Sequence, residues 1–214
     1  YSPPTIAKTE EWTNPVLLKI PFVHGVILFF VLSGFLITRI LLSNRDKYNE
    51  SQKNKFLLIK NFYFRRFFRI FPIYYLLIFF LFLINFENTR ELFPWLISYS
   101  SNIYQSINNV NIGNFNHFWS LAVEEQFYLF WPFIILFIKP NKTLLTIIIA
   151  ILLALIVRTY LFFYVGKWMA TSFFTLSSMH ALGIGALLAY VKLYKPKVEK
   201  KLANPRWLYL VSVL

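Results

Sequence analysis

A pair of carboxylates stands inside one of the most apolar stretches of the sequence. The segment HFWSLAVEEQFYLFWP, residues 117–132, carries Glu124 and Glu125 side by side. A carboxylate within a membrane span costs about 2.5–3.5 kcal/mol on insertion scales, so it requires a partner, water or a proton. We therefore predict both glutamates as catalytic candidates. The alternative, left equally open, is that they pair with arginines of neighbouring spans and only hold the bundle together.

A helix over this segment places more polar groups on the face of Glu124. The residues at spacings of 3, 4 and 4 are His117, Ser120, Glu124 and Tyr128. Such positions share one face, whereas Glu125 lies about 80° aside. His117 and Glu124 are thus the candidates for removing a hydroxyl proton, provided that the helix already begins at His117. If Ser120 is the N-cap instead, His117 lies in a loop.

Three arginines cluster in YFRRFFRIFP, residues 63–72. Arg65, Arg66 and Arg69 occupy neighbouring positions on one helical surface. Planar guanidinium groups bind phosphate and pyrophosphate through paired hydrogen bonds, so we predict a phosphate-binding role at the cytoplasmic start of a span. The alternative is a basic anchor that contacts anionic lipid headgroups.

Small residues interrupt two other apolar runs. Ser33 and Gly34 lie in GVILFFVLSGFLIT, and Gly185 lies in a stripe of small residues at a spacing of four. In membrane helices such residues allow close backbone approach, so we predict helix packing for all three.

The composition indicates that the candidate residues lie in a membrane protein. The 214 residues are 57% hydrophobic and 14% charged, against about 45–50% and about 25% in soluble domains. The net charge of +13 gathers in short stretches between apolar runs, which indicates juxtamembrane loops and not a nucleic-acid partner. With no Cys and three scattered His, the sequence predicts no metal site and no bound cofactor.

The apolar runs predict an all-α polytopic membrane bundle in a single domain, residues 1–214. Five runs approach or reach the roughly 20 residues that a span needs; they are residues 23–42, 70–86, 118–138, 144–165 and 173–194. Residues 92–104 form a short span or a re-entrant segment, and residues 207–214 begin a span that is cut short.

Charge sets the expected orientation. The stretches 43–69, 139–143 and 195–206 are basic and are therefore expected in the cytoplasm, whereas residues 87–117 are expected outside. This arrangement works only if residues 92–104 do not cross, so the charge pattern favours a re-entrant segment. We expect the protein in a bacterial inner membrane.

Together these motifs resemble the membrane-bound acyltransferase family 3, integral membrane proteins that O-acylate extracytoplasmic carbohydrates. Residues 117–128 match its H-x-W-S-L-x-V-E-E-Q-F-Y signature, and Arg66 and Arg69 match its R-x-x-R element. Residues 25–38 are similar to a further element of the family, and residues 179–190 to a late helix.

The resemblance implies transfer of an acyl group, most often acetyl, from cytosolic acyl-CoA to a sugar hydroxyl. The three arginines would then bind the phosphates of the donor, and His117 with the two glutamates would face the acceptor. The implied partners are the bilayer, acyl-CoA and a carbohydrate.

The chain also departs from the family pattern. Ile27 replaces a usual acidic residue, and Ser178 and His180 stand where Arg and Asp are common. The family opens with a helix that carries an Arg and, eleven residues on, a central His, and His24 does not occupy that position. We therefore expect a middle portion of such a protein, inactive by itself.

Two other functions remain compatible with the residues. A transporter or proton-coupled permease would use Glu124, Glu125 and Arg158 as an intramembrane relay. A non-catalytic scaffold would use the polar groups only for packing. Substitution of Arg66 and Arg69 separates the three functions, through loss of acyl-CoA binding, of flux, or of folding alone.

Overall fold

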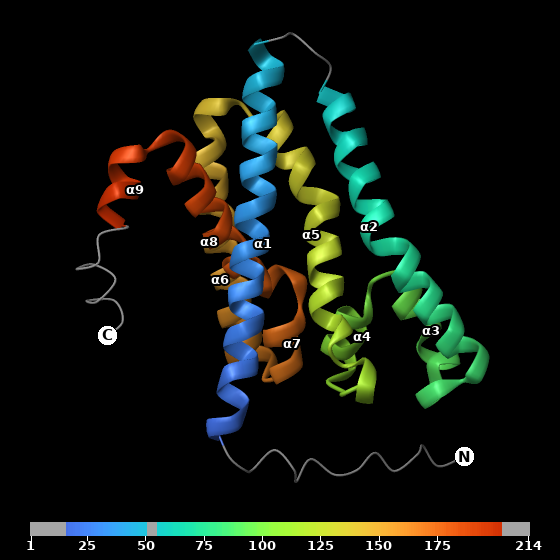
Figure 1. Ribbon diagram of the computed structural model, residues 1–214. Coiled ribbons are helices and arrows are strands. Elements are labelled where there is room, and N and C mark those ends of the chain that lie inside the picture. Colours follow the sequence, from blue (N-terminus) through green and yellow to red (C-terminus); the bar gives the residue numbers. More distant parts are fainter. Residues whose placement is uncertain (1–15, 51–54, 203–214) are drawn as a thin grey trace.

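The computed structural model describes residues 16–50 and 55–202, and within these ranges the regular structure is entirely helical (Figure 1). The helices are α1 (Val16–Glu50), α2 (Lys55–Ile84), α3 (Thr89–Ile97), α4 (Ser101–Asn108), α5 (Phe118–Phe137), α6 (Thr143–Tyr160), α7 (Trp168–Phe173), α8 (Thr175–Tyr194) and α9 (Pro196–Leu202). Single turns cover Phe86–Asn88, Gly113–Phe115 and Pro140–Lys142, and a π-helical turn covers Leu161–Val165.

Within the residues that the structure describes, five helical segments are long and apolar enough to cross a bilayer, which confirms the predicted fold class. They are Gly25–Lys47, Lys55–Ile84, Gly113–Phe137, Pro140–Val165 and Trp168–Tyr194. A helix satisfies its own backbone hydrogen bonds, as a lipid environment demands. The chain is thus an integral membrane protein. The shortened span expected at residues 207–214 lies outside the described residues.

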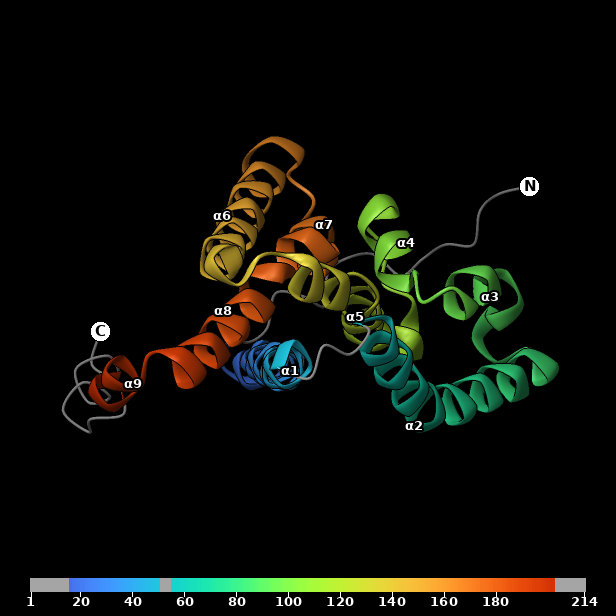
Figure 2. The ribbon, with the colours of Figure 1, turned by 90° about the horizontal axis from the view of Figure 1, so that it is seen from above.

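The predicted start of the helix that forms the second span was wrong. We placed it at Ile70, after a basic loop over residues 43–69, but α1 continues to Glu50 and α2 already begins at Lys55. Lys and Arg are good helix formers whose long stems can lie along apolar surface, so basic residues do not end the helix. Pro72 consequently lies inside α2 and not in its first turn, and α2 bends along its length in Figure 2.

Residues 92–104 form a hairpin of two short helices. Because α3 has 9 residues and α4 has 8, neither can cross the membrane. The turn between them, residues 98–100, points between α2 and α5 in Figure 1. The hydroxyls of Tyr74 and Tyr75 donate to the carbonyls of Leu96 (2.7 Å) and Ile97 (3.0 Å), which satisfies the end of α3. The segment therefore does not cross as a single helix, and its re-entrant position in the membrane stays a prediction.

Helix α1 packs most closely against α8 (Figure 2). A Cβ atom built on Gly34 would lie 2.0 Å from the carbonyl oxygen of Leu182, and one built on Gly185 would lie 2.0 Å from that of Val31. Ala181 and Ala189 are buried on the same stripe of α8. The two backbones are therefore in direct contact, as small residues in membrane helices allow.

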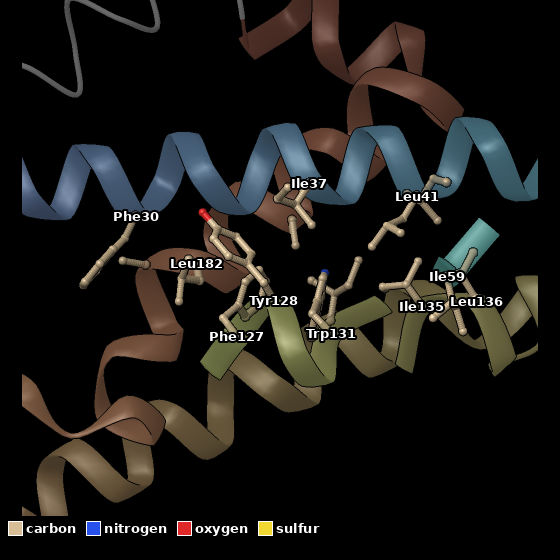
Figure 3. Close-up of a cluster of buried hydrophobic side chains, with 14 of the residues drawn as sticks. Phe30, Ile37, Leu41, Ile59, Phe127, Tyr128, Trp131, Ile135, Leu136 and Leu182 are labelled. Atoms are coloured by element: carbon tan, nitrogen blue, oxygen red, sulfur yellow. The ribbon is translucent and has the colours of Figure 1, made fainter. Parts of the chain in front are cut away.

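The main core fills the space between α1, α5 and α8 (Figure 3). The Trp131 indole is 1% exposed and donates to the Thr38 hydroxyl at 2.8 Å, which joins α5 to α1. A second core, around Tyr74, Leu96 and Phe118, lies between α2 and the hairpin. The functional candidates on α5 lie at the border between the two cores.

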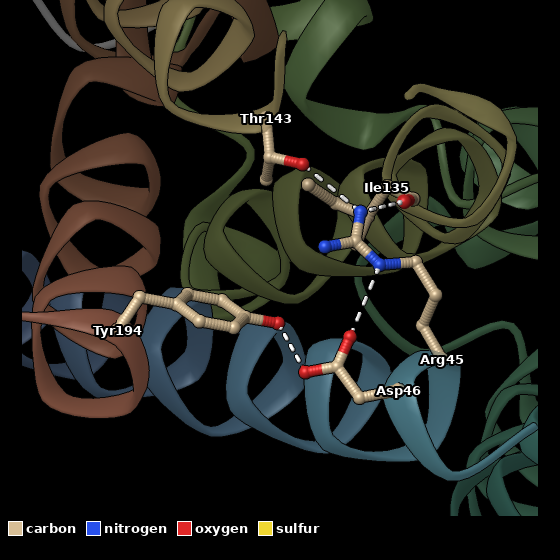
Figure 4. Close-up of polar contacts among 5 residues, drawn as sticks. All are labelled: Arg45, Asp46, Ile135, Thr143 and Tyr194. Atoms are coloured by element: carbon tan, nitrogen blue, oxygen red, sulfur yellow. Dashed lines mark hydrogen bonds and ion pairs between the residues drawn. The ribbon is translucent and has the colours of Figure 1, made fainter. Parts of the chain in front are cut away.

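A buried arginine ties four helices together at one end of the bundle (Figure 4). The Arg45 side chain is 2% exposed and donates to the carbonyl of Ile135 (3.1 Å) and the hydroxyl of Thr143 (2.9 Å). Its Nε lies 3.7 Å from Asp46, which accepts a hydrogen bond from the Tyr194 hydroxyl. Since Ile135 is in the last turn of α5, Arg45 satisfies a carbonyl that has no intrahelical donor.

Candidate functional site

The candidate site lies where α2 crosses α5. The Arg66 guanidinium carbon is 3.2 Å from the centroid of the Tyr128 ring, and Arg66 Nε is 3.9 Å from Glu125 Oε1. The two side chains of the ion pair are 20% and 10% exposed. Glu125 is two turns into α5, so the arginine acts at depth within the bundle and not at its basic end.

A proline explains why α2 meets α5 at this level. Pro132 lies inside α5 and has no N–H, so the carbonyl of Tyr128 loses its usual helical donor. The Tyr63 hydroxyl of α2 supplies one: it lies 3.3 Å from the Tyr128 carbonyl and 2.7 Å from that of Leu129. A side chain of α2 therefore supplies the hydrogen-bond donor that the backbone of α5 lacks at this turn.

Replacement of Tyr63 by Phe should therefore lower stability by about 1–2 kcal/mol, because the Tyr128 carbonyl is left without a donor. Replacement of Pro132 by Ala restores a backbone N–H, so Tyr63→Phe should cost less in the Pro132→Ala background. Circular dichroism in detergent follows the thermal unfolding of the natural chain, of each single variant and of the double variant. The four unfolding temperatures give the coupling between Tyr63 and Pro132. Equal costs in both backgrounds would contradict the explanation.

Two cavities flank the contact between α2 and α5, and Arg66 lines both. The first, about 310 Å³, lies between α1 and α2 and is named the basic cavity. Its polar lining consists of Asn44, Asn61, Arg65, Arg66 and Arg69. All three predicted arginines thus face one space.

The second cavity, about 280 Å³, lies between α2, α5 and the turn of the hairpin, and is named the hairpin cavity. It is lined by Tyr63, Arg66, Phe67, Phe71, Ser98, Tyr99, Glu125, Gln126, Tyr128 and Leu129. Glu125 is therefore the one of the three predicted catalytic residues that lines either of these two cavities.

Glu124 points to α1 instead. Its side chain is 4% exposed and lies within hydrogen-bonding reach of the Ser33 and Tyr128 hydroxyls, while Oε1 has no hydrogen-bond partner among the described residues. Figure 3 shows the Tyr128 hydroxyl directed toward α1. Ser33, which we assigned to packing, thus also faces a carboxylate.

His117 does not join this group. Helix α5 begins at Phe118, so His117 is its exposed N-cap residue. Glu124 follows seven positions later, about 10 Å along the helix axis. The predicted polar stripe exists as a helical face, but its first member lies at the end of the bundle and cannot act directly with Glu124.

Gln126 holds the hairpin against α5. Its Nε2 donates to the carbonyl of Tyr99 (2.7 Å) and to Oδ1 of Asn102 (2.9 Å), and its Oε1 accepts from the hydroxyl of Thr175. Asn102 is fully buried and also donates to Thr175 and to the carbonyl of Phe173. This network fixes the turn that carries Tyr99 beside Glu125.

Sequence reasoning did not single out Tyr63, Tyr99 or Gln126. Gln126 adjoins the glutamate pair and was within reach of the sequence, whereas Tyr99 enters the site only because the hairpin folds back. Arg158, the arginine proposed for a proton relay, donates to the Thr171 carbonyl at 3.2 Å, and the arginine paired with Glu125 is Arg66.

Comparison with known proteins finds one family model and several related proteins. A family model described as "Acyltransferase domain" matches residues 4–214. The chain is 37% identical over 145 residues to the peptidoglycan O-acetyltransferase OatA of Listeria monocytogenes, covering 59% of this chain and 22% of that protein. It is 33% identical over 184 residues to the O-acetyltransferase OatA of Staphylococcus aureus, covering 78% of this chain and 30% of that protein.

The chain thus spans less than a third of the length of these curated relatives. An uncharacterized protein of Haemophilus influenzae is 37% identical over 123 residues, which are 51% of this chain and 47% of that protein. No solved structure matches the chain.

Proposed function

The chain belongs to the acyltransferase domain family, and from this premise we propose that it transfers an acetyl or other acyl group from acyl-CoA to a hydroxyl of a cell-wall or exported carbohydrate. The relatives named as O-acetyltransferases support the acetyl group and the class of acceptor. One observation carries the proposal: Arg66 borders a cavity rich in arginine and also pairs with a carboxylate, Glu125.

The basic cavity is the proposed donor site. Arg65, Arg66 and Arg69 offer planar donors suited to the phosphates of CoA, and Asn44 and Asn61 offer amides for its polar arm. Lys47, near the end of α1, and Lys55, the first residue of α2, lie at the end of these two helices that is nearer the basic cavity. We propose that this end of the bundle faces the cytoplasm, where acyl-CoA is made.

Glu125 is the proposed general base. As it removes the proton of the acceptor hydroxyl, the oxygen attacks the thioester carbon, the C–O bond forms, the C–S bond breaks, and the proton passes to the departing CoA thiolate. The Arg66 guanidinium beside Glu125 stabilises the negative charge that develops on the carbonyl oxygen. His117, at the opposite end of α5 from the basic side, is proposed to contact the acceptor.

Binding of CoA tests the donor site directly. We expect CoA to bind the purified chain in detergent, and the double replacement Arg65→Gln and Arg69→Gln to weaken binding at least about tenfold, because two charge-assisted contacts are lost. Isothermal titration calorimetry measures the affinity. Arg90→Gln is the matched control, since Arg90 is exposed on α3 and lines neither cavity. Equal affinity in all three proteins would contradict the proposed donor site.

A further inference from the structure

The hairpin cavity has very little free hydrogen-bonding capacity for its size. The Tyr63 hydroxyl is already bound to backbone carbonyls of α5, and both ends of the Gln126 amide are engaged. The Ser98 hydroxyl donates to the Pro94 carbonyl at 2.6 Å and lies 2.5 Å from the Ser100 hydroxyl. These groups line the cavity, but their donors are already hydrogen-bonded within the protein and are not free for a ligand.

Three buried polar atoms of the lining have no hydrogen-bond partner among the described residues, and they belong to Tyr99, Arg66 and Glu125. The Tyr99 hydroxyl belongs to a residue 7% exposed, and it has no hydrogen-bond partner in the part of the chain that the structure describes. Arg66 Nε and Glu125 Oε1 face each other across 3.9 Å without a hydrogen bond. A buried hydroxyl without a partner is costly, so it indicates a missing acceptor in this cavity.

The rest of the wall is apolar or aromatic. Phe67, Phe71 and Leu129 line it, and Phe67 and Leu129 are also about half exposed on the outer surface of the bundle. A sugar would leave its many hydroxyls unpaired against such a wall. A ligand with one small polar function and an apolar body satisfies it, as in most ligand pockets.

We propose that the hairpin cavity is the acyl pocket, in which the carbonyl of the acyl group accepts a hydrogen bond from Tyr99 and the chain lies against Phe67, Phe71 and Leu129. This inference rests on the proposed acyl transfer and names its substrate class. The cavity of about 280 Å³ has room for about nine water-sized groups of about 30 Å³. An acetyl group fills only a fraction of it, so the pocket accepts longer acyl chains.

The test is a series of acyl thioesters of increasing length, acetyl, butyryl and hexanoyl, each carried by CoA and by N-acetylcysteamine. The purified chain should bind longer members more tightly, by up to about fourfold for each methylene buried. Ser98→Trp fills the cavity and should abolish the dependence on length. Ser100→Trp is the matched control, because Ser100 belongs to the same turn but does not line the cavity.

Tyr99→Phe tests the polar end of the pocket. It should weaken every thioester by about five- to tenfold and leave free CoA unaffected, since only the carbonyl loses its donor. The unfolding temperature should stay the same or rise, because the hydroxyl has no partner to lose, so weaker binding cannot be ascribed to misfolding.

The outcomes distinguish a failure of the proposed acyl pocket from a failure of CoA as the proposed donor. Affinity that does not depend on chain length, or that responds equally to Ser98→Trp and Ser100→Trp, overturns the acyl pocket even if CoA binds. Length-dependent binding of the cysteamine thioesters without any binding of CoA supports the pocket and overturns the proposed donor.

Discussion

Replacement of Gly34 by Ala should lower the unfolding temperature by about 6–12 °C, which corresponds to about 3 kcal/mol in a protein of this size. The added Cβ would lie 2.0 Å from the Leu182 carbonyl oxygen and 2.9 Å from Leu182 Cα. Both are backbone atoms of α8, so no side chain can turn away to make room. The helices must separate, and the packing of α1 on α8 is lost along its length. Circular dichroism at increasing temperature, in one detergent, measures the effect.

Gly25→Ala is the matched control for this change. Gly25 belongs to the same helix, and a Cβ built on it meets nothing within 4 Å. Because Ala is a better helix former than Gly by up to about 1 kcal/mol, the control should unfold at the same or a slightly higher temperature. If both variants unfold together, α1 and α8 do not approach as closely as the structure shows.

The sequence was sufficient for the number of spans among the described residues and for the role of Gly34 and Gly185 in helix packing, but not for which two helices meet there. Apolar runs of span length predict helices because lipid leaves the backbone no other partners. Gly34 and Gly185 were visible as gaps in otherwise bulky runs. The charge pattern favoured a segment that does not cross, and residues 92–104 indeed lie in two helices too short to span, but their arrangement as a hairpin was not predicted.

The site itself could be predicted only in part. The residue types were visible, but the pairing of Arg66 with Glu125 depends on where α2 begins, and the basic residues before Ile70 concealed that start. The alternatives that we weighed for the glutamates were a bundle-holding ion pair and a catalytic role. Glu125 combines the two geometries, because it pairs with an arginine and also borders a cavity.

Tyr99 was beyond the reach of sequence reasoning for a topological reason. It lies in a turn with a positive φ of 50°, and it lines the same cavity as Glu125 because the Gln126 network holds that turn against α5. No local pattern around residue 99 predicts that this residue lines a cavity together with a residue of α5. His117 shows the converse, since it shares a helical face with Glu124 and yet lies too far along the axis to meet it.

Replacement of Arg66 by Met should lower stability by about 3 kcal/mol, because it leaves the Glu125 carboxylate in a mostly buried place without its counter-charge. The cost comes from the unpaired carboxylate and not from lost volume, since Met fills much of the same space. The double variant with Glu125→Gln should therefore recover most of the loss, to within about 1 kcal/mol of the natural chain. Thermal or denaturant unfolding of the natural chain, both single variants and the double variant completes the cycle.

Arg65→Met provides the comparison that isolates burial. Arg65 is the next residue on the same helix and lines the same basic cavity, but its side chain is exposed and no carboxylate among the described residues forms an ion pair with it. Its loss should change stability by no more than about 0.5 kcal/mol while still weakening CoA. If Arg66→Met is as mild as Arg65→Met, or if Glu125→Gln fails to rescue it, the two side chains do not interact as an ion pair. Glu125 would then remain a candidate base without Arg66 to position it, and the link between the two cavities would have to run through another residue.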